Sequence, residues 1–151
     1  IGDWSSDVCS SDLNPCLLAA AALSAVASLL HVAIIFGGGP WYRFFGAGER
    51  MASAAEAGHP YPAIVTSAIA VVLGCWSAYA LSGAGLIAPL PLLKWALVAI
   101  TSIYLLRGLA LFPLLAFASG RTTPFLWWSS LVCLGYGAVH LAGLIQVWDR
   151  L

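Results

Sequence analysis

Residues 15–36 read PCLLAAAALSAVASLLHVAIIF, and this stretch decides the fold. It carries no charged side chain, and as a helix it is long enough to cross a hydrocarbon core about 30 Å thick, which takes about 20 residues. Three further apolar stretches, at 62–81, 92–115 and 125–147, have a similar length. The glycines and proline of 37–40 follow the first stretch, and we expect them to end its helix.

Lipid contains no water that could hydrogen-bond a free backbone, so only helices and closed barrels cross it. The apolar stretches lack the strict alternation of a strand. The sequence therefore predicts an all-α protein, an antiparallel four-helix transmembrane bundle with both termini on the same side of the membrane. Pro113 leaves the end of the third helix open, because it can end the span or kink it. Basic residues are too evenly divided between the two sides to fix the orientation.

Small and aromatic residues fit the same architecture. Small side chains recur within the spans at spacings that let helix backbones approach closely. Aromatic residues gather near the ends of the spans, as they do at the two interfaces of a membrane. The small residues are Ala20, Ser24 and Ser28 in the first span and Gly135, Gly137 and Gly143 in the fourth.

The composition agrees with an integral membrane protein. Hydrophobic residues make up 62% of the chain and charged residues only 8%, and the mean hydropathy is +0.95. A soluble domain carries about 25% charged residues and could not bury this much apolar surface. The few basic residues are scattered, which excludes nucleic acid as a partner, because that requires a clustered basic face.

Residues 3–13, DWSSDVCSSDL, are polar and acidic, unlike everything that follows. This run resembles one reading frame of a common short-read sequencing adapter. The resemblance implies that residues 1–13 are not native, and we expect a single membrane domain over 14–151. Without the three aspartates of the run, six basic side chains face three acidic ones, and the net charge is +3.

The loop after the first span is the most distinctive polar segment. Trp41, Tyr42 and Arg43 belong to an aromatic stretch that we expect to lie in the membrane interface. Glu49 begins a segment that could form a short helix, which Gly58 would end. Two interpretations stay open: a lid over a cavity of the bundle, or a connector whose charges face water.

Arg107 is the most costly residue to place, because a charge at the centre of a span costs about 2.5 to 3.5 kcal/mol. It lies in the later half of the third span, on the side of the first loop. It could snorkel to the interface, pair with Glu49 or Glu56, or bind an anionic headgroup or a carbonyl group.

His31 and His140 raise the question of a haem, since paired histidines in helix bundles bind one. Counting along spans of opposite direction places the two rings about 10 Å apart in depth, too far for a single iron. We therefore expect no metal site. His140 is better interpreted as a packed histidine near Tyr136, hydrogen-bonded across helices.

Enzyme signatures are lacking, although the sequence does not decide the question. The spans contain no Asp or Glu, which argues against a proton-coupled exporter. No Ser-His-Asp set, carboxylate pair or phosphate-binding loop is present, so a non-enzymatic protein is favoured.

Two motifs carry a family resemblance. The first is the span ending near His31, followed by GGPWYRFFG at 38–46, and the second is Arg107-Gly108 late in the third span. In these features the chain resembles small, DoxX-like four-helix proteins. The resemblance implies a bundle in the bacterial cytoplasmic (inner) membrane, in some cases associated with redox or quinone-linked partners.

These observations lead to two expectations for function. The first is a non-enzymatic accessory or scaffold of a membrane complex, with the lipid bilayer and either a membrane protein or a second copy as partners. The alternative is a redox-accessory module without a resident cofactor that holds a quinone, an isoprenoid or a lipid under the first loop. The candidate ligand-binding residues of the alternative are Arg107, His31, Trp41, Tyr42, Arg43, Glu49 and Tyr104.

Overall fold

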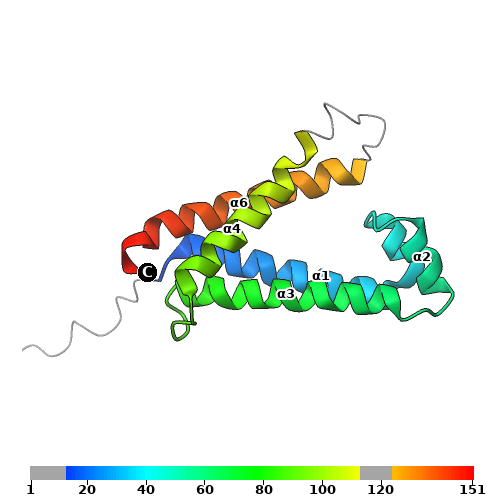
Figure 1. Cartoon of the computed structure of the whole chain (residues 1–151), viewed down its shortest axis with the longest axis horizontal. Coiled ribbons are helices and arrows are strands. Elements are labelled where there is room, and N and C mark those ends of the chain that lie inside the picture. Colours follow the sequence, from blue (N-terminus) through cyan, green and yellow to red (C-terminus); the bar gives the residue numbers. More distant parts are fainter. Residues whose placement is uncertain (1–12, 113–123) are drawn as a thin grey trace, which may run out of the picture.

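The computed structural model describes residues 13–112 and 124–151. The adapter-like run lies outside the described residues apart from Leu13, as do Pro113 and the end of the predicted third span. Every regular element within the described ranges is helical. The elements, shown in Figure 1, are α1 (Pro15–Phe44), α2 (Glu49–Glu56), α3 (Tyr61–Gly83), α4 (Leu93–Leu109), α6 (Pro124–Val147) and a final 3-10 turn, η2 (Trp148–Arg150).

The all-helical class predicted from the sequence is confirmed for the described residues. Three helices are long and apolar enough to cross a membrane: α1, α3, and α6 together with η2. The predicted spans 62–81 and 125–147 agree closely with α3 and α6. The fourth long helix, α4, has 17 described residues and is shorter than a typical span.

The start and the end of α1 follow from local sequence signals. The Asn14 side chain accepts a hydrogen bond from the backbone N–H of Leu17 at 2.8 Å and caps the helix. Gly38 has φ 64° and ψ −154°, a conformation that glycine adopts without the strain other residues would meet. The expectation that 37–40 end the helix is wrong in part: α1 kinks at Gly38 and continues to Phe44, because Pro40 suits the first turn of a new helical segment.

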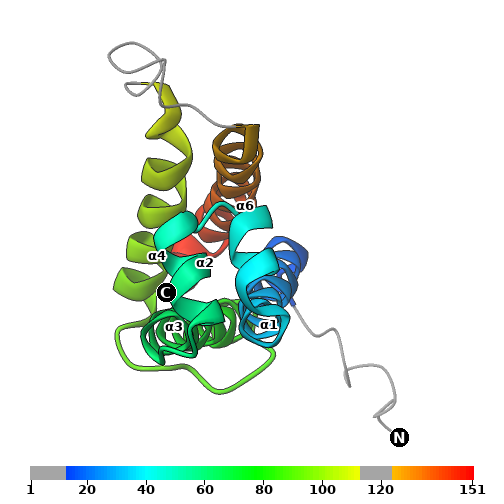
Figure 2. The ribbon, with the colours of Figure 1, turned by 90° about the vertical axis from the view of Figure 1, so that its right-hand side faces the viewer.

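The long helices form two antiparallel pairs, α1 with α3 and α4 with α6 (Figure 1). The pairs meet at one end and diverge toward the other, where α2 lies (Figures 1 and 2). Hydrogen bonds of Asn14 tie the meeting end together. Its backbone N–H donates to Ala84 O at 3.1 Å, and its Nδ2 donates to Gln146 Oε1 at 2.7 Å.

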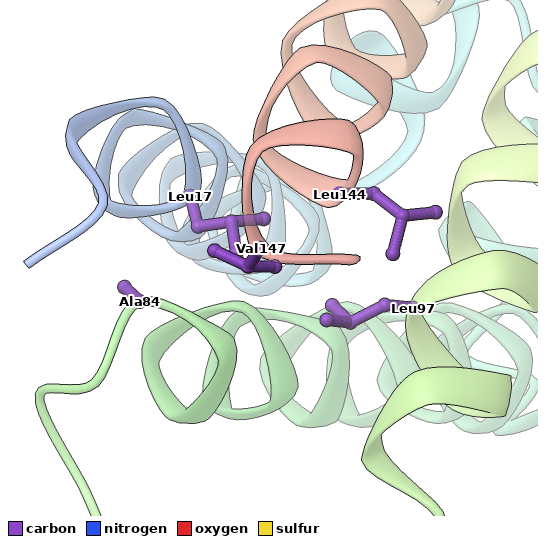
Figure 3. Packing of buried hydrophobic residues seen from close by; sticks show 5 residues of the cluster. All are labelled: Leu17, Ala84, Leu97, Leu144 and Val147. Atoms are coloured by element: carbon purple, nitrogen blue, oxygen red, sulfur yellow. The ribbon is translucent and has the colours of Figure 1, made fainter. Parts of the chain in front are cut away.

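The core at the meeting end depends on glycines that let leucines approach the helix backbone. Figure 3 shows the cluster formed by α1, α4, α6 and Ala84, which directly follows α3; Leu17 is fully buried in it. A Cβ on Gly143 would lie 2.6 Å from Leu17 Cγ, and one on Gly137 would lie 2.6 Å from Leu105 Cδ2. The predicted role of small residues is therefore confirmed for these two glycines, but Gly135 has nothing within 4 Å of a Cβ. The cluster consists of Leu17, Ala84, Leu97, Leu144 and Val147.

Gly143→Ala is expected to destabilise the protein by about 1 to 3 kcal/mol, the usual cost of overpacking, because Leu17 and its backbone N–H both lie close to the new methyl group. Gly135→Ala is the matched control on the same helix and should leave stability unchanged or slightly raised. Unfolding in mixed micelles of dodecyl maltoside and SDS measures both variants. Equal midpoints for the two variants would contradict the tight packing at Gly143.

Candidate functional site

A polar and aromatic cluster receives a side chain from each of the four long helices. We name it the central cluster: Ser24 from α1, Trp76 from α3, Tyr104 from α4, and Tyr136 and His140 from α6. Ser24 Oγ and Tyr104 Oη share a hydrogen bond of 3.1 Å. The Tyr104 ring centroid lies 5.0 Å from that of Trp76, 5.5 Å from Tyr136 and 5.1 Å from His140. Tyr104 is therefore the residue through which the cluster is connected.

His140 is the least satisfied member of the central cluster. Its side chain is 0% exposed, and its Nδ1 lies 2.9 Å from the carbonyl oxygen of Tyr136. A carbonyl can only accept, so Nδ1 carries the hydrogen, and Nε2 of the neutral ring is an acceptor. Nε2 is buried and has no hydrogen-bond partner among the described residues. The prediction that His140 packs near Tyr136 is confirmed, but the hydrogen bond lies within α6 and does not cross to another helix.

The last turn of α1, the turn that follows it and α2 form a second cluster, which we name the cap, at the diverging end. Arg43 donates to Glu49 through Nε at 2.9 Å and through Nη2 at 2.7 Å, and it also pairs with both carboxylate oxygens of Glu56. Beneath these exposed charges, Tyr42 is buried and its Oη hydrogen-bonds Thr66 Oγ1 of α3 at 3.1 Å. The cap is thus held by one arginine clamp and one buried tyrosine.

The arginine clamp changes the acidity of the two glutamates. Hydrogen bonds from Arg43 and Ser53 lower the pKa of Glu49 to about 2, and hydrogen bonds from Arg43 lower the pKa of Glu56. Both carboxylates therefore stay ionised well below neutral pH. The sequence-based suggestion that one of them pairs with Arg107 is not met, because both bind Arg43.

Arg107 lies apart from the cap, in the last turn of α4, with its side chain exposed. Its Nη1 and Nη2 donate to the hydroxyl groups of Ser130 and Ser129, each at 3.3 Å. His31 is also separate. Its Nδ1 donates to Ala27 O at 2.7 Å, and the residue lies about 10 Å beyond Ser24 along α1, away from the level of the central cluster.

The structure does not bring the predicted ligand-binding residues together. The cap contains Trp41, Tyr42, Arg43 and Glu49. The central cluster contains Tyr104. The other two, His31 on α1 and Arg107 on α4, lie separately. Sequence reasoning missed Ser24 and Trp76 as neighbours of Tyr104. The four-residue spacing of Tyr136 and His140 is the one signal that pointed to the face of α6 they share.

No family model, curated protein or solved structure matches this chain. The DoxX-like resemblance therefore stays a prediction, carried by the motifs at 38–46 and at Arg107-Gly108.

The clamp makes the stability of the cap depend on pH. Glu49 has a lower pKa in the folded protein than the ordinary value of 4.5, so its contribution is complete above that value and is lost as pH falls toward about 2. Hydrogen exchange of residues 49–56, corrected for intrinsic rates, should show α2 losing protection in that range. The double variant Glu49→Gln, Glu56→Gln should show weak protection at every pH. Protection that stays constant from pH 6 to pH 2.5 in the unmodified protein would contradict the clamp.

Proposed function

We propose that the protein is a four-span protein of the bacterial cytoplasmic membrane that acts as a non-enzymatic accessory or scaffold of another membrane protein. Three span-length helices and the antiparallel packing of α4 against α6 support the four-span topology. In this topology both termini lie on the same side of the membrane. The partner is a second membrane protein or another copy of the chain.

The outward face of α6 carries this proposal. Gly135, Ala138 and Ala142 are all exposed and lie on one side of the helix, about one turn apart. The buried glycines of α6, Gly137 and Gly143, pack against leucines of the same chain, but the space around Gly135 is open. An exposed row of small residues on a span lets a second helix approach closely, which is how helices associate in membranes without a hydrophobic driving force.

Gly135→Leu with Ala138→Leu is expected to abolish association through this face, because the added side chains keep a partner helix at a distance. Cross-linking in native membranes, followed by purification and native mass spectrometry, should give a stoichiometric complex for the unmodified protein and none for the double variant. Ser102→Leu, which adds bulk on the exposed face of α4, is the matched control and should keep the complex. The same complex in all three proteins, or in none, would overturn the proposal.

A second candidate function is a redox-accessory module that binds a quinone, an isoprenoid or a lipid, and the unpaired Nε2 of His140 favours it. An apolar groove of about 320 Å³ runs along α3 and includes Trp76, whose ring contacts Tyr104 of the central cluster. Because Nε2 accepts, the ligand has to donate, and the hydroxyl group of a quinol meets that need. The site proposed here is at the central cluster, whereas the sequence-based expectation was a site under the first loop.

Decylubiquinol is a suitable probe for the second candidate. Binding to the protein in lipid nanodiscs should show saturable, stoichiometric uptake that His140→Phe removes, because phenylalanine fills the space without an acceptor. His31→Phe is the control, since His31 lies at another level of the bundle, and it should bind as the unmodified protein does. Uptake that is unchanged in His140→Phe would exclude the central cluster as the site.

A further inference from the structure

No acidic side chain among the described residues pairs with Arg107. Its two described partners, Ser129 and Ser130, offer neutral hydroxyl oxygens. These contacts occupy two of the five N–H donors of a guanidinium group and fix its plane, so about three donors remain. The side chain is exposed on a helix that packs among span-length helices, where an uncompensated cation is unfavourable.

The positions of the acidic residues in the sequence explain why none of the described ones pairs with Arg107. Between Glu56 and Asp149 the chain contains no Asp or Glu. Glu49 and Glu56 are both engaged by Arg43. Asp149 follows α6 at its far end, about 28 Å from Ser130 along the helix axis. Within residues 13–112 and 124–151, no acidic side chain therefore supplies a counter-charge to Arg107, and a ligand can supply it.

An apolar groove lies close to Arg107 along the chain, because its lining includes Leu111, four residues further on. It has a volume of about 400 Å³ and lies between the end of α4 and the start of α6. Leu134 links the groove to Arg107, because it packs against the neighbouring Gly108. Two exposed tryptophans on the groove place this end of the bundle at the level of the lipid headgroups, where tryptophan is enriched. The lining residues are Leu111, Phe112, Trp127, Trp128, Leu131 and Leu134.

We infer that Arg107 binds the phosphate group of an anionic phospholipid, one of whose acyl chains lies in this groove. A guanidinium group binds phosphate through two parallel hydrogen bonds, and the bond is strong because both partners are charged. Ser129 and Ser130 position the guanidinium group for this contact. A lipid with net negative charge is favoured over a zwitterionic one, whose own cation already accompanies its phosphate. The inference does not depend on the accessory role or on the face of α6 that carries Gly135.

Native mass spectrometry of the full chain, released from micelles that contain either phosphatidylglycerol or phosphatidylcholine, tests the site. The unmodified protein is expected to retain one phosphatidylglycerol and to retain phosphatidylcholine more weakly. Arg107→Gln should lower the affinity for phosphatidylglycerol about tenfold or more, which is the loss expected for charge-assisted hydrogen bonds. Arg50→Gln removes an exposed arginine of α2 and should leave the retained lipid unchanged.

Two further measurements distinguish loss of the lipid site from loss of the fold, and binding of a lipid from binding of free phosphate. Arg107→Lys keeps the charge without the planar fork and should bind phosphatidylglycerol at an intermediate level, with an unchanged unfolding midpoint. Inorganic phosphate alone should not displace the lipid, because the acyl chain contributes to binding. Equal retention by Arg107→Gln and Arg50→Gln, equal retention of the two lipids, or complete displacement by inorganic phosphate would each overturn the inference.

Discussion

The close approach of Leu17 to Gly143 is the contact on which the rest of the structure depends. It brings the start of α1 against the end of α6 and so joins the two helix pairs at one end. With the pairs joined there, Ser24 and Tyr104 come within hydrogen-bond distance further along the bundle. The central cluster can form because Gly143 leaves room for Leu17, which lies about two turns of α1 before Ser24.

The diverging end is organised by a different principle, the pairing of scarce charges. Gly38 bends α1, and the chain then folds back so that Glu49 and Glu56 both reach Arg43. Because one arginine binds both carboxylates, neither is available to Arg107, which has no acidic partner in the part of the chain that the structure describes. The ion pairs of the cap therefore bear on Arg107, near the α4–α6 groove, because they bind the two glutamates that could otherwise pair with it.

The sequence predicted the helices well and their relative arrangement poorly, for a physical reason. Apolar length and flanking prolines define where α3 and α6 begin and end, because the hydrocarbon core requires a minimum run of apolar residues. Residue counting also gives depth along a helix, which separates His31 from His140. It does not give the rotation of one helix against the next, and that rotation decides that Tyr104 contacts Ser24 and Trp76. The pairing of Arg43 with two glutamates depends on the turn between α1 and α2, where Gly46 and Gly48 have positive φ. Apolar length and residue counting do not give the direction of that turn.

The divergence of the two helix pairs gives the molecule the shape of a wedge. The joined end presents a narrow cross-section and the end that carries α2 a wide one (Figures 1 and 2). In the four-span topology that we propose, such an inclusion would displace more lipid from one leaflet than from the other. The monolayer around the narrow end would then tilt inward, and a membrane already bent in that sense would relieve this strain. Under that topology, the angle between the pairs would couple the protein to the curvature of the membrane.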